Sequence, residues 1–268
     1  MAALAPLLLY LGRLVLSQNG RIFRPGPLLP YSPADYGMRY ETIPLGPAGA
    51  AEGIAWWLPQ PAARQAVIFF HGSDGNLSHE LPTLRFLHQL PANVLAVEYP
   101  GYAGGRTRPS ERGCYQAAEA GWRIVTGAKG IAPEQVILLG HSLGSAVAVY
   151  LAARVGLGGL VIQSGFTSVP DMAALAFRYL PARLFVWTKM NSQARLAGCR
   201  CPVLILHSAD DEHIPVAHAQ RLFQASPVPK KLLVFRGPHF GSHWLRLEQV
   251  QAAWRELLAR EFSSWQTA

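Results

Sequence analysis

Short, continuous runs of apolar residues recur along the chain and are separated by segments that favour turns or helices. These runs predict eight strands, near residues 39–44, 54–58, 67–70, 94–98, 136–139, 160–163, 203–207 and 232–235. From the third run onward, helical segments intervene between successive strands, which predicts a mostly parallel, doubly wound sheet with an antiparallel start. The central runs are apolar throughout, so we expect helices on both faces of the sheet.

The length and composition fit one α/β domain. Half of the 268 residues are hydrophobic, which is enough to bury a sizeable core. We expect this domain to cover residues 25–268 and to follow an apolar N-terminal segment over residues 1–24.

One serine stands between two glycines at a predicted strand-to-helix turn. Residues 140–144 read GHSLG and precede the helix-prone stretch 145–154. This pattern is typical of a nucleophile elbow, in which Gly140 and Gly144 leave room for a sharp turn that projects the hydroxyl of Ser142. A helix N-terminus would then face a developing oxyanion. The alternative is a tight structural turn whose serine only caps the helix.

A nucleophilic serine needs a histidine base, and the base needs an orienting carboxylate. The buried-strand pattern at 201–207 leads into a loop with three carboxylates, Asp210, Asp211 and Glu212. Loops at the carboxyl ends of strands are where such sites form. The residues alone leave the choice among the three open, and Asp211 capping a helix that begins near Pro215 is an alternative.

The candidate base is a histidine in the loop after the last predicted strand. His239 follows the strand pattern at 231–235 and precedes the predicted C-terminal helix. His243, four residues later, falls in the first turn of that helix, from where its side chain would reach the sheet less easily. We therefore favour His239 over His243 as the base.

Five segments, in order along the chain, resemble motifs of the α/β-hydrolase superfamily, most closely its small branch of membrane-associated serine hydrolases. Beside GHSLG, they are HGSDGN at 71–76, VEYPGYAGG at 97–105, QSGFTS at 163–168 and HSADDEHIP at 207–215. The resemblance covers about residues 22–254. It implies the α/β-hydrolase fold, with a mostly parallel eight-stranded sheet, helices on both faces and a small helical cap.

The resemblance also assigns roles to residues. The family's H-G-x-x-D-x-x-V-P motif aligns with 207–215 and places the acid on Asp211, and the family's catalytic histidine falls on His239. In these enzymes, the loop after the third strand and the residue after the nucleophile supply main-chain N–H groups to the oxyanion hole. Those residues correspond to Ser73 and Leu143, and a serine at position 73 keeps the main-chain donor.

The resemblance implies a serine hydrolase that forms an acyl-enzyme. We expect it to cleave carboxylic esters or thioesters of apolar acyl groups, from a small-molecule or lipid-like substrate. An amidase or peptidase that uses the same triad is the alternative enzyme. A non-catalytic, hydrolase-like binding module is the alternative outside catalysis.

Residues 169–196 carry more bulky apolar side chains than a plain surface connection needs. They include Met172, Leu175, Phe177, Tyr179, Leu180, Leu184, Phe185 and Trp187. We predict a small helical cap whose inner face helps to line an acyl pocket, with Phe166, Phe177 and Trp187 as candidate substrate-binding residues. The alternative is that the same residues simply cover the sheet.

The N-terminal segment suggests contact with a membrane. Residues 2–16 are almost wholly apolar, but they are fewer than the roughly twenty that a spanning helix needs, and Arg13 interrupts them. The run lacks a preceding basic region and a clear cleavage site, which argues against a secretory signal. A net charge of +8 favours anionic lipid surfaces. We therefore expect a membrane-associated protein, with a cytoplasmic protein whose amphipathic helix packs on the body as the alternative.

The remaining patterns exclude several other functions. The three cysteines, Cys114, Cys199 and Cys201, are too few for a disulfide framework and lack metal-binding spacing. The chain has no zinc motif, no glycine-rich phosphate loop and no basic-aromatic motif typical of nucleic-acid binding. We therefore predict no cofactor, no metal and no nucleic-acid partner.

Overall fold

The computed structural model describes residues 12–13, 15–46, 53–241 and 243–267. Within them, eight strands form one central sheet in the order β10-β9-β8-β7-β4-β6-β3-β2. The strands are β2 (Glu41–Pro44), β3 (Ile54–Leu58), β4 (Gln65–Phe70), β6 (Ala92–Val97), β7 (Val136–His141), β8 (Gly159–Gln163), β9 (Val203–Ser208) and β10 (Lys230–Phe235). The pairs β2–β3 and β3–β6 are antiparallel, and all the other neighbours are parallel. The predicted fold class is confirmed.

Two hydrophobic clusters explain why the strand runs are apolar at every position. On β4, Ala66, Ile68 and Phe70 belong to one cluster, whereas Val67 and Phe69 belong to the other. Successive side chains of a strand point to opposite faces, so a strand that is covered on both faces needs an apolar residue at each position.

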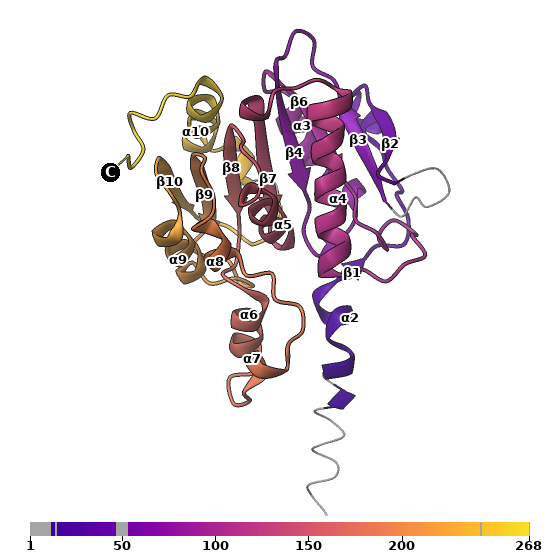
Figure 1. Cartoon of the computed structure of the whole chain (residues 1–268), viewed down its shortest axis with the longest axis vertical. Helices are drawn as coiled ribbons and strands as arrows, with labels where there is room; N and C mark the ends of the chain where they lie inside the picture. The colour runs from indigo at the N-terminus through magenta and orange to yellow at the C-terminus, as the bar shows by residue number, and fades with distance from the viewer. Residues whose placement is uncertain (1–11, 14, 47–52, 242, 268) are drawn as a thin grey trace, which may run out of the picture.

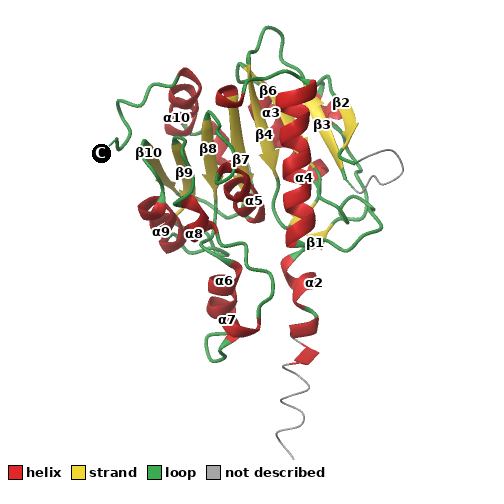
Figure 2. Cartoon of the chain, in the orientation of Figure 1, coloured by secondary structure: helices red, strands yellow, loops and turns green. Residues whose placement is uncertain are grey.

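Helices cover both faces of the sheet (Figure 2). One cluster includes side chains of α4 (Glu111–Arg123), α5 (Leu143–Ala152), α8 (Ser192–Leu196) and α9 (Ala217–Ala225), and the other includes side chains of α3 (Leu81–His88) and α10 (Glu248–Ala259). Short turns of 3₁₀ helix occur at Pro33–Tyr36, Leu77–Glu80, Pro133–Gln135 and His243–Arg246, and a π-helical turn occurs at Ile124–Ala128.

The chain also contains a small parallel pairing that the sequence analysis did not predict. It joins β1 (Arg24–Pro25) to β5 (Asp74–Gly75). Strands of two residues leave no apolar run to detect. The pairing places the chain just after the N-terminal segment beside the loop that follows β4.

The carboxyl ends of β4, β7, β8, β9 and β10 all lie on one edge of the sheet, because these strands are parallel. Ser142, Asp211 and His239 follow β7, β9 and β10 in the chain. Parallel pairing therefore gathers residues about a hundred positions apart in sequence at one edge, which we call the catalytic edge.

Residues 169–196, the cap segment, begin at that same edge, and the part of this segment before α8 projects from it (Figure 1). They contain α6 (Val169–Ala176), α7 (Ala182–Phe185) and α8. Met172 and Val169 pack against the core, but five large apolar side chains are exposed: Leu175, Tyr179, Leu184, Phe185 and Trp187. The alternative that this whole group covers the sheet is wrong for these five, because α6 and α7 extend beyond the sheet.

The N-terminal segment is described only from residue 12, so most of the apolar run predicted there lies outside the described residues. Residues 12–13 and 15–16 are helical, and α2 (Gln18–Ile22) follows. No helix within the described ranges combines the length and the hydropathy that crossing a bilayer requires. The side-chain amide of Gln18 donates to the Phe185 carbonyl, and its oxygen accepts from the Trp187 N–H, so α2 is bonded to the cap segment.

Candidate active site

Ser142 occupies the sharp turn between β7 and α5. Its φ of 51° lies in the left-handed region, which costs a non-glycine residue about 1–3 kcal/mol and persists only where the surroundings impose it. Gly140 and Gly144, on either side of Ser142, allow β7, α5 and the end of β4 to approach one another very closely. A Cβ at Gly140 would collide with the backbone of Gly144, and one at Gly144 would collide with the carbonyl of Phe70. Both positions therefore require glycine, because no side chain would fit between these backbone segments.

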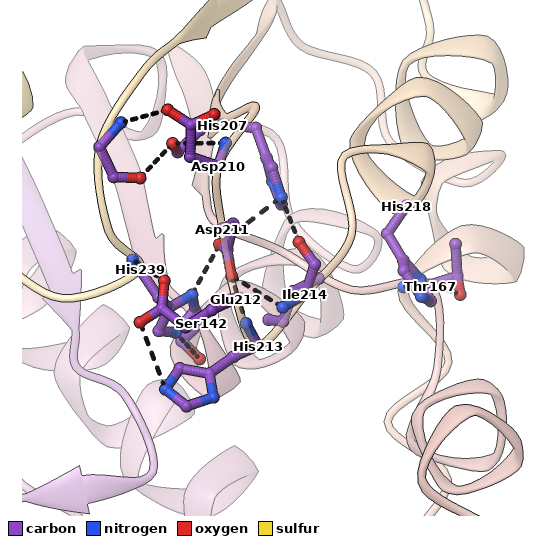
Figure 3. Close-up of polar contacts among 12 residues, drawn as sticks. Ser142, Thr167, His207, Asp210, Asp211, Glu212, His213, Ile214, His218 and His239 are labelled. Carbon is purple, nitrogen blue, oxygen red and sulfur yellow. Dashed lines mark hydrogen bonds and ion pairs between the residues drawn. The ribbon is translucent and has the colours of Figure 1, made fainter.

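The side chains of Ser142, His239 and Asp211 form one continuous hydrogen-bonded chain (Figure 3). The distance from Ser142 Oγ to His239 Nε2 is 3.1 Å, and that from His239 Nδ1 to Asp211 Oδ2 is 2.7 Å. All three side chains are buried. The arrangement leaves Nε2 able to accept the serine proton while the carboxylate holds Nδ1–H, which is the geometry that base-assisted nucleophilic attack requires.

The structure selects one carboxylate of the three in the loop after β9. Asp211 contacts His239 Nδ1, whereas Asp210 turns to Arg236 at 3.2 Å, and a Glu212 oxygen accepts the main-chain N–H of His239. The second oxygen of Asp211 accepts the N–H groups of residues 213 and 214. Asp211 therefore closes a local turn within its own loop, and α9 begins only at residue 217.

These contacts stabilise Asp211 as a carboxylate. Burial raises the pKa of Asp211, but the hydrogen bonds from His239 and from the N–H groups of Ile214 and His213 outweigh burial and bring the pKa below its ordinary value. An ionised carboxylate in this position fixes the tautomer and the ring orientation of His239.

His207, the penultimate residue of β9, stabilises the same loop. Its Nε2 lies 2.8 Å from the carbonyl oxygen of Ile214 and 3.6 Å from Asp211 Oδ2. A carbonyl can only accept, so Nε2 carries the proton and donates it. Burial lowers the pKa of His207, which favours the neutral ring. His207 thereby connects strand β9 to the far end of the loop that presents Asp211.

A buried ion pair between His71 and Glu98 stabilises the loop after β4. His71 Nε2 lies 2.7 Å from Glu98 Oε1, and His71 Nδ1 lies 2.8 Å from the Gly72 carbonyl oxygen. Both neighbours are acceptors, so both ring nitrogens donate and the ring is an imidazolium. Burial is the largest single influence and lowers the pKa of His71. The charge and hydrogen bond of Glu98, the charge of Glu80 and the hydrogen bond to the Gly72 carbonyl together outweigh burial and raise the pKa overall. The hydroxyls of Tyr99 and Tyr102 donate to the carbonyls of this loop.

This arrangement places the loop beside the candidate nucleophile. A Cβ built on Gly72 would lie 3.5 Å from the Cβ of Ser142. Leu143 is the first residue of α5, directly after Ser142. The use of the Ser73 and Leu143 N–H groups as oxyanion donors stays a prediction, which this proximity supports.

Aromatic rings surround His239 on several sides. Phe240 and His213 meet its ring edge to face, with ring centroids 4.7 and 5.1 Å away. The ring of His141 stacks on it with a tilt of 30° and a centroid distance of 5.5 Å. His141 Nδ1 is 3.4 Å from Glu80 Oε1. No sequence motif assigned a role to His141 or Glu80, although the position of His141 next to Ser142 was an available signal.

The three candidate substrate-binding residues have different surroundings. Phe166 is buried in the core, Phe177 is half-buried, and Trp187 is 62% exposed on the cap segment. The cap segment is anchored near Phe166, where the side chain of Thr167 lies beside His218 (Figure 3) and their hydroxyl oxygen and ring Nδ1 are 2.8 Å apart. The Thr167 hydroxyl also donates to the Asp171 carboxylate. A shared pocket role for the three residues stays a prediction.

The described residues also include potential metal ligands and cysteine thiols. Among the residues that the structure describes, no group of three or more His, Cys, Asp and Glu side chains could hold a metal ion. The three cysteines are buried, and burial raises the pKa of each thiol, which disfavours a reactive thiolate.

Comparisons with known proteins agree with this fold. Residues 67–191 match the model of the "Alpha/beta hydrolase family". An uncharacterized protein of Mycobacterium tuberculosis is 33% identical over 184 residues, which are 68% of this chain and 66% of that protein. The protein bem46 of Schizosaccharomyces pombe is 27% identical over 211 residues, covering 75% of this chain and 70% of bem46.

Solved structures share the fold at low identity. An esterase of Pyrococcus furiosus superposes with a TM-score of 0.72 at 19% identity and covers 90% of this chain and all of that one. A puromycin-hydrolyzing peptidase of M. tuberculosis superposes with a TM-score of 0.64 at 17% identity, over 85% of this chain and 40% of that one. The chain therefore has the α/β-hydrolase fold, and residues 67–191 resemble the α/β-hydrolase family.

Proposed function

We propose that this protein is a serine hydrolase that cleaves carboxylic esters or thioesters of apolar acyl groups. The observation that carries the proposal is the buried chain of hydrogen bonds from Ser142 through His239 to Asp211, with links of 3.1 and 2.7 Å. A serine that only capped a helix would not need a histidine and a carboxylate aligned behind it. Ser142 also makes no capping hydrogen bond through its side chain.

The proposed reaction begins with attack of Ser142 Oγ on the acyl carbonyl carbon. His239 Nε2 takes the serine proton, and Asp211 stabilises the imidazolium that forms. The N-terminus of α5 and the N–H groups of Ser73 and Leu143 would stabilise the oxyanion of the tetrahedral intermediate.

Collapse of this intermediate breaks the bond to the alcohol or thiol, which takes the proton back from His239. Water then attacks the acyl-enzyme while His239 again removes a proton. The second collapse releases the carboxylic acid and returns the proton to Ser142.

The preference for apolar acyl groups rests on the apolar side chains near the catalytic edge. Phe166 lies in the loop after β8, and Phe177 follows α6 in the cap segment. Amide hydrolysis on the same triad is the second candidate, and the M. tuberculosis peptidase shares this fold. One assay distinguishes the two activities.

The test is hydrolysis of a series of chromogenic esters, from acetate to palmitate, with an aryl amide alongside. We expect ester turnover in the wild type and a loss of about 10³-fold or more in Ser142→Ala, because the nucleophile is gone. Ser263→Ala, at an exposed serine, is the matched control and should behave as wild type. A serine-directed fluorophosphonate should label the wild type but not Ser142→Ala.

Two results would overturn the proposal. Equal ester turnover in wild type and Ser142→Ala would exclude the serine mechanism. Folded wild type that turns over the aryl amide but no ester would establish the amidase alternative instead.

A further inference from the structure

The outer surface of the cap segment is unusually apolar for a surface in contact with water. Among the described residues, twelve large apolar side chains are exposed, and five of them lie within residues 175–187. These five are between 52% and 87% exposed: Leu175, Tyr179, Leu184, Phe185 and Trp187. Such a concentration marks an interaction surface, whereas single exposed apolar residues are normal.

The N-terminal helix contributes to the same surface. Gln18 bonds the main chain of Phe185 and Trp187, and Leu16, which is 77% exposed, lies just before it. Figure 1 shows α2 and α7 extending from the catalytic edge of the sheet, away from the body. In the sequence, the ten residues 2–11 that precede this helix contain no charged side chain. We call Leu16 and the five exposed cap residues the docking face.

The chain segments that form the docking face carry an excess of positive charge. Residues 12–31 and 169–196 together contain seven arginines and lysines but one acidic residue, Asp171. Asp74 and Glu111, from other segments, pair with Arg24 and Arg195. Asp171 is paired with Arg183 and Arg221. Arg13 and Arg178 are exposed, and Arg178 lies over the ring of Tyr179. A partner for this face must therefore be apolar inside and anionic at its surface.

A phospholipid bilayer with anionic head groups meets both requirements. Tryptophan and tyrosine favour the boundary between acyl chains and head groups, and arginine side chains reach from an apolar surface to phosphate. A second copy of the chain fits less well, because it would bring two sets of basic residues together. We propose that the docking face binds an anionic bilayer surface and turns the catalytic edge towards the lipid.

The proposal does not depend on the proposed function, because lipid binding and ester hydrolysis are measured separately. It concerns a surface that lies in the interface plane, which is a different mode from crossing the bilayer. Its consequence for the reaction is that a lipid-like substrate would enter from the bilayer side of the molecule.

The experiment is flotation of the full chain with vesicles of phosphatidylcholine alone or with three tenths phosphatidylglycerol. We expect binding to the anionic vesicles that weakens with salt. The variant Tyr179→Ser with Leu184→Ser should lose about tenfold or more in partition, since two large apolar side chains no longer enter the lipid. Arg178→Gln should lose about fivefold at low salt.

The matched control is Tyr36→Ser with Val234→Ser, which removes a tyrosine and an aliphatic residue exposed at other positions. This control should bind as wild type. All variants should hydrolyse a short, water-soluble ester at the wild-type rate without vesicles, which shows that they are folded. Loss of ester turnover in every protein, with lipid binding intact, would overturn the proposed function and leave the docking face established.

Three outcomes would overturn the docking proposal. The first is wild type that stays with the soluble fraction in the presence of anionic vesicles. A second is a cap variant that floats as well as wild type, which would assign lipid binding to the N-terminal segment alone. A third is a lipid-free dimer, seen by sedimentation, that the cap variant abolishes, which would make the face an interface between copies.

Discussion

The catalytic edge and the cap segment adjoin each other, yet they are built in opposite ways. At the catalytic edge, polar groups are buried and bonded to one another: Asp211 accepts from three donors, and Glu98 accepts from His71 and two main-chain N–H groups. In the cap segment, large apolar groups are exposed to solvent. Side chains that must keep a fixed geometry need to be buried and fully hydrogen-bonded. A surface that binds a partner needs apolar side chains that remain exposed after folding.

This difference has a physical basis. A buried polar group that loses its partner keeps its full desolvation penalty, so substitutions at the catalytic edge should be severe. Removal of an exposed side chain changes the free energy of unfolding little, because the side chain makes few contacts in the folded state.

The largest effect should come from Asp211→Asn. An asparagine cannot hold His239 in the required tautomer or stabilise its charge, so we expect ester turnover to fall about 10³- to 10⁴-fold. The matched control is Asp210→Asn at the neighbouring, exposed aspartate that contacts Arg236. It should change turnover less than about threefold, because its side chain does not reach His239. Equal losses in the two variants would refute the assignment of the acid.

The second effect is on folding. Glu98→Gln breaks the buried pair with His71 and should lower the free energy of unfolding by about 3–5 kcal/mol below pH 6.5. Glu41→Gln removes an exposed partner of Lys129 and should cost at most about 1 kcal/mol. Urea denaturation of the two variants beside wild type checks this, and similar costs would contradict the role of the buried pair.

A third effect concerns pH. The folded pKa of His71 is raised, so its stabilising contribution is complete below its unfolded pKa of about 6.5 and is lost as pH rises through the folded value. The stability advantage of wild type over Glu98→Gln should therefore shrink as the pH increases above 6.5.

His207 and His218, whose pKa values burial lowers, act in the opposite direction. They are present in both proteins, so their contributions cancel in the difference between them. Urea denaturation of wild type and Glu98→Gln from pH 5.5 to 9 measures this difference, and a constant or growing advantage would show that His71 is neutral.

The smallest effect should come from the cap segment. Trp187→Ala should change the free energy of unfolding by less than about 0.5 kcal/mol, since the side chain is mostly exposed. Trp254→Ala, at a fully buried tryptophan of α10, should cost about 3–5 kcal/mol. Thermal unfolding of the two variants makes the comparison. A loss above about 2 kcal/mol for Trp187→Ala would show that the cap contributes to the core.

Phe177→Ala and Trp187→Ala test the predicted acyl pocket. If either side chain contacts the acyl group, its removal shifts the preferred chain length in the ester series without a matching loss of stability. Loss of stability with an unchanged chain-length preference would exclude a pocket role for that residue.

The sequence was informative wherever a local requirement is strict. The apolar runs predicted the eight strands of the sheet because a strand covered on both faces must be apolar at each position. Gly140 and Gly144 marked the turn at Ser142 because no side chain fits at either place. The short pairing of β1 with β5 was missed because two residues carry no pattern.

The sequence pattern could not show which of the three adjacent acidic residues after β9 contacts His239. Asp210, Asp211 and Glu212 are all acidic and adjacent, so composition and spacing treat them alike. The resemblance to a family pointed to Asp211, and in the structure its side chain is the one on His239 Nδ1. Only the path of the loop, fixed in part by the bond from His207 to Ile214, turns that carboxylate inward.

The strands, the α/β class and the turn that presents Ser142 could therefore be predicted from the amino-acid pattern, because each depends on contacts that are local or repeat along the chain. Which carboxylate meets His239, how His71 acquires its charge, and which apolar residues of the cap remain exposed became clear only in the folded molecule. Apolar spacing in a helix is the same whether its partner is the core, a membrane or another chain. Burial, direction and charge state are properties of the assembled fold, and they arise only when segments distant in sequence meet.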